Sequence, residues 1–125
     1  MTTPRDVPTP VEIAPPDSVV LAITNAPDGA TAARLARTLV DERLAACVNL
    51  LAPCTSVYRW QGAIEEAAEI PMLIKTTRRR WNALEARLRE LHPYEVPELI
   101  ALNPSAISAA YAGDRKSTRL NSSHR

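Results

Sequence analysis

Residues 47–76 read CVNLLAPCTSVYRWQGAIEEAAEIPMLIKT, and this stretch decides the fold. It consists of two long runs of β-branched, aromatic and aliphatic side chains, separated by Gln61-Gly62. A glycine in a two-residue connection is typical of a β-hairpin, because glycine adopts the positive φ that tight turns need. The pattern predicts one strand from Cys47 to Trp60 and a second from Ala63 to Thr76.

Shorter elements are predicted on both sides of this hairpin. The apolar run at residues 18–24 is typical of a buried strand. Asp28 is a suitable N-cap for an amphipathic helix that ends near residue 43. Residues 81–91 repeat the helical spacing and stop at His92-Pro93, before a last strand at residues 99–102. The order of elements predicts an α+β fold, a ferredoxin-like βαββαβ sandwich with a long hairpin.

The hairpin is longer than the domain that carries it. Fourteen extended residues span about 46 Å at ~3.3 Å per residue, whereas a compact domain of residues 18–113 is about 32 Å across. The overhang carries Val57, Tyr58, Trp60 and Ile64, and an exposed apolar edge invites pairing with another chain. We therefore predict a homo-oligomer with Tyr58 and Trp60 in its interface. The alternative is a hairpin strand broken at Pro53 or Pro71.

Composition excludes several classes of protein. Residues 18–113 hold ten basic and ten acidic side chains, and this neutrality argues against a nucleic-acid partner. The three glycines form no glycine-rich phosphate loop, so no organic cofactor is expected. The two cysteines form neither a zinc ribbon nor a disulfide scaffold. No apolar run approaches the ~20 residues of a membrane span, so we expect a cytoplasmic protein without a membrane partner.

The two ends of the chain differ from its middle. Residues 1–17 contain five prolines and are expected to form a disordered Thr/Pro-rich leader before the domain at residues 18–113. Residues 114–125 form a basic tail without amphipathic periodicity. We interpret this tail as non-native sequence; the alternative is a natural basic tail that contacts an acidic surface.

Several motifs within residues 18–113 resemble the CutA divalent-cation tolerance family: Glu42-Arg-Leu-Ala-Ala-Cys-Val-Asn49, Ser56-Val-Tyr-Arg-Trp-Gln-Gly62, Ile74-Lys-Thr76, His92-Pro-Tyr-Glu-Val-Pro-Glu98 and Ile100-Ala-Leu102. The resemblance implies a homotrimer akin to the PII signalling proteins, a cytoplasmic location, and a response to copper or another divalent metal ion. The alternative is a PII-like regulatory module that binds a small ligand or a partner protein in the cleft between subunits. The chain departs from the family at Thr24, where relatives can carry a metal-linked cysteine, and at Asp114, where a Trp-bearing helix usually follows.

Cys47 and His92 are the candidate metal ligands. A thiolate beside an imidazole suits copper or zinc, and His92 is the one histidine within residues 18–113. Cys47 and Cys54 are seven residues apart, which places them on opposite faces of a regular strand. One chain therefore offers a partial site that a second subunit completes. The alternatives are a buried, apolar role for Cys47 and an ordinary helix-terminal role for His92.

A proline-framed loop before the last strand forms a candidate ligand cleft. It carries Tyr94, Glu95 and Glu98, and Lys75 could neutralise one of its carboxylates. The alternative is an inter-subunit salt bridge beside a packed tyrosine. The glutamates at positions 65, 66 and 69 are interpreted as a solvated acidic face. No serine-hydrolase or zinc-protease motif is found, so we expect a protein that is not an enzyme.

Overall fold

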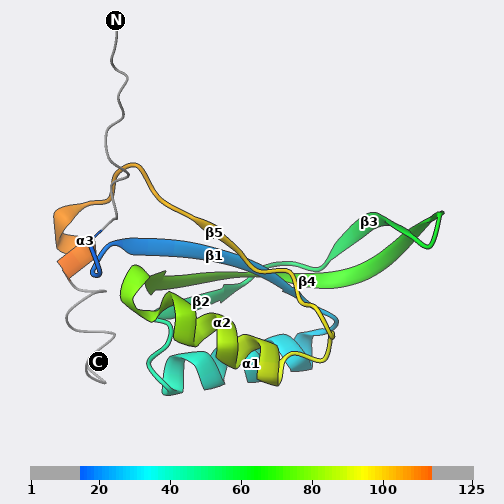
Figure 1. Cartoon of the computed structure of the whole chain (residues 1–125), viewed down its shortest axis with the longest axis horizontal. Helices are drawn as coiled ribbons and strands as arrows, with labels where there is room; N and C mark the ends of the chain where they lie inside the picture. The colour runs from blue at the N-terminus through cyan, green and yellow to red at the C-terminus, as the bar shows by residue number, and fades with distance from the viewer. Residues whose placement is uncertain (1–14, 114–125) are drawn as a thin grey trace, which may run out of the picture.

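The computed structural model describes residues 15–113 and contains an antiparallel sheet covered by helices. Its elements are β1 (Val19–Ala26), α1 (Gly29–Asp41), β2 (Cys47–Leu50), β3 (Cys54–Trp60), β4 (Ala63–Thr77), η1 (Arg78–Arg80), α2 (Trp81–Leu91), β5 (Ile100–Leu102) and α3 (Ala109–Gly113). The sheet has the order β2-β4-β1-β5, and β3 pairs with the outer part of β4. Helices α1 and α2 lie on the same side of it (Figure 1). This arrangement confirms the predicted ferredoxin-like α+β fold.

The core lies between the two long helices and one face of the sheet. Alternate residues of β1 point into it, as the burial of Val20, Ala22 and Ala26 shows. Helix α1 contributes Leu35 and Leu39, and α2 contributes its own leucines at helical spacing. Because a helix leaves its first N–H groups unsatisfied, α1 needs a cap. Asp28 supplies it as predicted: its Oδ1 accepts a hydrogen bond from the Thr31 N–H over 2.7 Å.

The start of the second helix is held by residues that we expected to lie in the leader. The N–H groups of Arg78 and Arg79 donate to the carbonyl oxygens of Ser18 and Pro16 over 3.0 and 2.9 Å. Pro16, from the predicted leader, thus contacts the domain and, together with Ser18, caps η1 with its backbone carbonyl. The leader prediction for residues 1–14 and the interpretation of residues 114–125 as non-native sequence lie outside the described residues.

The predicted strand from Cys47 to Trp60 is divided into β2 and β3 by residues 51–53. Pro53 lacks the N–H that a continuous ladder needs. Strand β4, by contrast, runs without interruption through Pro71. The Leu51 N–H donates to the Pro71 carbonyl over 2.9 Å, so the polar groups of Pro71 face this gap and not β1. The missing N–H of Pro71 therefore costs no hydrogen bond to β1.

The far part of the hairpin, which we call the arm, comprises β3, the turn, and residues 63–69 of β4. Gln61 and Gly62 have φ angles of 51° and 84°, and positive φ at both positions is the geometry of a type I′ turn. The arm extends well beyond the helices (Figure 1). Tyr58 and Trp60 are 45% and 60% exposed on it. The predicted overhang therefore exists; whether a second copy covers it stays a prediction.

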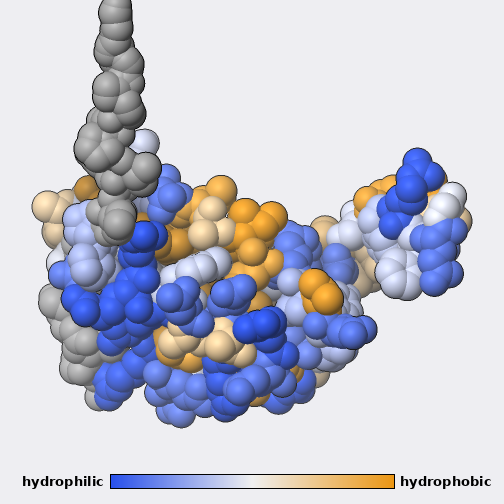
Figure 2. All heavy atoms as spheres, viewed as in Figure 1, coloured by the Kyte–Doolittle hydropathy of each residue, from blue (hydrophilic) through white to orange (hydrophobic). Residues whose placement is uncertain are grey.

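The sheet face opposite the two long helices, which we call the open face, is also apolar. Leu21 lies opposite Leu102 on β5 and opposite Lys75 on β4, and Lys75 in turn lies opposite Cys47 on β2. Ile100 and Leu102 are among the exposed large hydrophobic residues. Figure 2 shows hydrophobic side chains gathered beside β1 and β5, with a further group on the arm. The molecule thus presents two apolar surfaces.

Candidate functional site

The proline-framed loop that was predicted to line a cleft packs against the root of the arm. The Tyr94 hydroxyl donates a hydrogen bond to Glu69 Oε2 over 2.9 Å. The other oxygen, Glu69 Oε1, accepts from Ser56 Oγ over 2.6 Å. Burial of the phenol, followed by the neighbouring Glu69 carboxylate, raises the pKa of Tyr94 to about 12. Tyr94 is therefore held as a neutral donor at physiological pH.

His92 is buried and contacts Tyr94 of this pair. Its Nε2 lies 2.7 Å from the Asn25 carbonyl oxygen, and its Nδ1 accepts from the Tyr94 N–H over 3.1 Å. Since a carbonyl oxygen can only accept, Nε2 carries the proton and the ring is the neutral Nε2–H tautomer. The imidazole also packs against the Tyr94 ring, with the two rings tilted by 51° and their centroids 4.7 Å apart. Both ring nitrogens are engaged within the chain, so a metal ion at His92 would have to displace one bond.

The remaining residues of the predicted cleft divide into two groups. Glu98 accepts from Asn25 Nδ2 through its Oε1 over 3.2 Å, and its backbone carbonyl accepts from the buried Thr24 hydroxyl. Glu95 is exposed on the same loop. Lys75, however, lies six residues from Glu69 along β4, about 20 Å at ~3.3 Å per residue. Its Nζ instead lies 5.9 Å from the centroid of the Tyr111 ring, so it does not neutralise the carboxylates of this loop.

The two cysteines lie far apart on the hairpin. Cys47 pairs with Lys75 and Cys54 with Glu69, so six residues of β4, about 20 Å, separate them. The break at residues 51–53 removes the regular alternation from which opposite faces were inferred, but the separation still prevents the two thiols from sharing one ion. Cys47 is half-buried and Cys54 is exposed.

The structure does not bring Cys47 and His92 into one site within one chain. His92 bonds to Asn25, whose β4 partner is Pro71, four residues from the Cys47 partner Lys75. Four residues correspond to about 13 Å along the strand. Within residues 15–113, no group of three or more His, Cys, Asp or Glu side chains is placed to hold a metal ion.

Two residues at the root of the arm, Glu69 and Ser56, were missed by the sequence reasoning. Glu69 was assigned to a solvated acidic face, but it is half-buried and accepts two hydrogen bonds. The signal was present in the turn: pairing Trp60 with Ala63 sets a register that places Ser56 opposite Ala67, diagonal to Glu69. The Tyr94 contact carries no such local signal.

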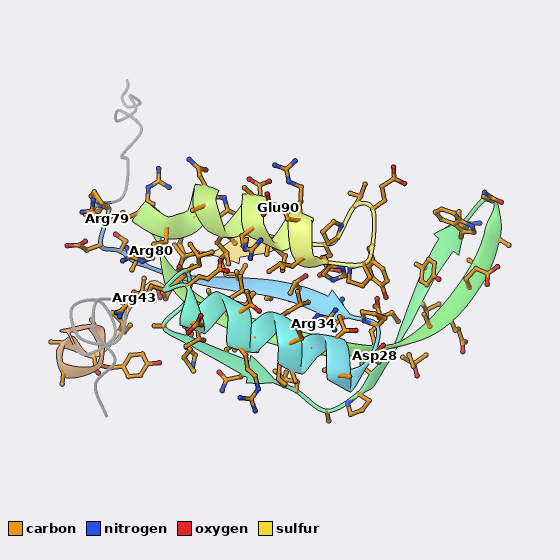
Figure 3. All side chains as sticks on the ribbon, turned by 90° about the horizontal axis from the view of Figure 1, so that it is seen from below. Asp28, Arg34, Arg43, Arg79, Arg80 and Glu90 are labelled. Atoms are coloured by element: carbon orange, nitrogen blue, oxygen red, sulfur yellow. The ribbon has the colours of Figure 1, made fainter. Side chains whose placement is uncertain are left out.

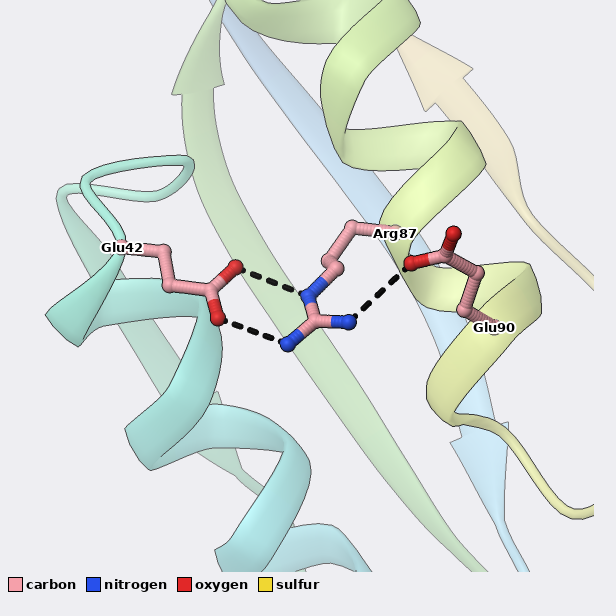
Figure 4. Close-up of polar contacts among 3 residues, drawn as sticks. All are labelled: Glu42, Arg87 and Glu90. Carbon is pink, nitrogen blue, oxygen red and sulfur yellow. Dashed lines mark hydrogen bonds and ion pairs between the residues drawn. The ribbon is translucent and has the colours of Figure 1, made fainter.

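A second polar cluster links the two long helices on the outer surface. The Arg87 guanidinium donates to both carboxylate oxygens of Glu42 over 2.8 Å each, and to Glu90 Oε1 over 3.0 Å (Figure 4). The hydrogen bond from Arg87 lowers the pKa of the Glu42 carboxyl. This cluster lies on a shallow groove of about 860 Å³ that it shares with Arg37 and Val40. Opposite charges balance in the lining, so the groove favours no particular ligand.

Arginines gather at the end of the domain that is remote from the arm, whereas Asp28 lies near the arm's root (Figure 3). Arg80 Nε donates to the Arg43 carbonyl over 2.6 Å, and Arg79 is 3.5 Å from the Asp17 carboxylate. These contacts tie the α1–β2 connection and residue 17 to η1. Among the described residues, no helix has the length and apolar character needed to cross a lipid bilayer.

Comparison with known proteins matches residues 20–113 to the family described as CutA1 divalent ion tolerance protein. The divalent-cation tolerance protein CutA of Thermus thermophilus is 45% identical over 82 residues, which are 66% of this chain and 80% of that protein. Protein CutA of Mus musculus is 48% identical over 87 residues, 70% of this chain and 49% of the mouse protein, so the match spans about half the mouse protein. The crystal structure of CutA from Xylella fastidiosa superposes with a TM-score of 0.79 at 43% identity, over 83% of this chain and 99% of that one. The chain therefore belongs to the CutA1 divalent ion tolerance protein family.

Proposed function

We propose that this chain acts in divalent-cation tolerance as a cytoplasmic homotrimer that binds copper or another divalent ion and catalyses no reaction. The observation that carries the assembly is the arm. Its aromatic residues Tyr58 and Trp60 are 45% and 60% exposed, although side chains of this size dominate the energetics of interfaces. A surface of this kind on a projecting hairpin favours contact with another copy.

The open face supports the same assembly. It carries half-buried and exposed apolar side chains, and strands β2 and β5 lie at the edges of the sheet with unpaired backbone groups. A second copy would cover both the apolar side chains and an edge. The number of three subunits comes from the resemblance to the family.

A metal site of this protein would be shared between copies. Cys47 is the ligand that one chain offers, because it is a free thiol on the open face, at the edge strand β2. Thiolate suits copper, and further ligands would come from a neighbouring copy. His92 would join such a site only after its bond to Asn25 or to Tyr94 opens.

A second candidate is the PII-like regulatory module. The observation in its favour is that Tyr94, Glu95 and Glu98 lie in one loop at the root of the arm. The separation of Lys75 from this loop weakens this candidate function for an anionic ligand, because the lysine charge does not lie beside the loop.

Light scattering and calorimetric titration of the full chain test these candidates. A mass of three times 13.7 kDa at micromolar concentration is expected, and a stable monomer would contradict the assembly. Titration with copper and zinc is expected to give heat. Heat from nucleotides or small anions, with none from metals, would support the regulatory module instead. Cell fractionation checks the location.

A further inference from the structure

The arm is connected to the domain at a narrow joint. Strand β3 is separated from β2 by residues 51–53, so of the two strands of the arm β4 alone continues into the domain as a strand. A two-stranded ribbon is twisted more strongly than a wider sheet, so the sheet alone does not fix the direction of the arm. The arm nevertheless needs a defined direction if it is to meet a second copy.

A hydrogen bond between side chains crosses this joint. Tyr94 belongs to the loop between α2 and β5, whereas Glu69 is the last β4 residue that pairs with β3. Their 2.9 Å bond therefore joins the domain to the arm. Ser56 holds the other Glu69 oxygen from β3, so the carboxylate is fixed from both strands of the arm.

The domain side of this bond is itself rigidly anchored. The Tyr94 backbone N–H donates to His92 Nδ1, and the opposite ring nitrogen donates to Asn25 at the end of β1. His92 is only 6% exposed. A continuous series of contacts thus runs from the core sheet through His92 and Tyr94 to Glu69.

We propose that Tyr94 and Glu69 form a brace that sets the angle between arm and domain and so orients Tyr58 and Trp60 for assembly. Register places Ser56, Tyr58 and Trp60 on one face of β3, together with Glu69 of β4, because side chains alternate along a strand. Because the brace fixes Glu69, it fixes the direction of the arm face that carries Tyr58 and Trp60. Only the assembly clause rests on the proposed trimer; restraint of the arm needs no partner.

The lever is long enough for the angle to matter. Glu69 lies seven residues from Gly62 of the turn, about 23 Å at ~3.3 Å per residue. A rotation of about 10° at Glu69 would move the tip by about 4 Å, more than the spacing of one residue along a strand. The register of an arm against a second copy would be lost at such a displacement.

Hydrogen exchange of the full chain, followed by mass spectrometry, tests the brace. Tyr94→Phe and Glu69→Ala, which remove the donor and the acceptor of the bond, are compared with wild type at concentrations where light scattering gives the same mass for all. We expect the amides of residues 54–68 to exchange roughly tenfold faster in each variant, while those of β1 and α1 keep their rates. The double variant should add little to either single change, because both remove the same bond. Glu66→Ala makes the same change on the opposite face of β4 and should leave both regions unchanged.

Unchanged exchange of residues 54–68 in both Tyr94→Phe and Glu69→Ala would overturn the brace. Equal acceleration in arm and domain would also overturn it, since it would indicate general destabilisation. If Tyr94→Phe does not fold, Glu69→Ala provides the comparison, because it removes the acceptor of the same bond. A monomeric wild type would end the trimer proposal but leave this readout valid, whereas a wild-type trimer with unchanged variants would end the brace alone.

Discussion

The Tyr94 hydroxyl and Glu69 Oε2 meet over 2.9 Å, although 25 residues separate them and they belong to different parts of the molecule. The pair joins the loop after α2 to the root of the arm. A neutral phenol donates to a carboxylate there, and burial together with that carboxylate favours the neutral form of the phenol.

Titration of Tyr94 should reduce stability at high pH. Its pKa rises from 10 in the unfolded chain to about 12 in the fold, so the folded state binds the proton more tightly. The contribution to the free energy of unfolding is fully present below pH 10 and is lost as the pH rises through 12. Urea titrations across this range, with phenolate absorbance as a second probe, measure the loss. Tyr94→Phe should flatten the dependence, and an unchanged slope would argue against the assignment.

The cap of α1 should respond to substitution and to acid. The hydrogen bond from the Thr31 N–H lowers the pKa of Asp28 below its ordinary value of 3.8. The stabilisation is therefore present above that value and is lost as the pH falls through the folded pKa. Asp28→Ala should lower the Tm by a few degrees at neutral pH, whereas Asp28→Asn, which keeps an acceptor, should lower it less. Equal effects of the two changes would contradict a capping role.

The leucines between α2 and the sheet should carry a large share of the stability. Leu88 is completely buried, so Leu88→Ala should reduce the free energy of unfolding by about 2–5 kcal/mol. Val96 is 86% exposed, and Val96→Ala should change it by less than about 0.5 kcal/mol. Chemical denaturation provides both values. A similar loss of unfolding free energy in the two variants would contradict the assignment of Leu88 to the core.

Trp60→Asp should weaken assembly far more than it weakens the protomer. The indole is exposed on the aromatic face of the arm, and a charge there would be desolvated against a second copy. We expect a dissociation constant higher by roughly tenfold or more, with unchanged helical circular dichroism. Thr55→Asp places the same charge on the other face of β3 and is the matched control. If both variants assemble like wild type, the arm is not the interface.

The Cys47 thiol should be required for copper binding. Cys47→Ser should reduce copper affinity, because the hydroxyl is a much poorer ligand than thiolate. Cys54→Ser removes the other free thiol, about 20 Å away, and should leave the affinity unchanged. Calorimetry with copper compares the variants. His92→Gln tests whether the imidazole participates after its internal bonds open; unchanged binding in both Cys47→Ser and His92→Gln would remove these residues from the site.

Local features of the fold could be read from the sequence because their causes are local. Asp28 precedes an apolar helical repeat, and a side-chain oxygen there reaches an N–H three residues away. Gln61-Gly62 forms the expected turn because a tight hairpin connection needs positive φ. The end of α2 at Leu91 reflects the effect of Pro93 on the residue before it. Each signal acts over a few residues.

The candidate site depends instead on which distant residues meet, and the tertiary structure alone decided this. The loop 93–98 was singled out from the sequence, but Tyr94 in it bonds to Glu69, and Lys75 lies six residues further along β4, about 20 Å away. The break at residues 51–53 likewise depends on where β4 exchanges one partner strand for the other. By itself the sequence determined the two long helices, the turn, the cap and the overlong hairpin, since these follow from periodicity and backbone preference. The roles of Tyr94, Glu69 and His92 required the fold, because a hydrogen bond about 3 Å long is set by packing and register between segments that are remote in the chain.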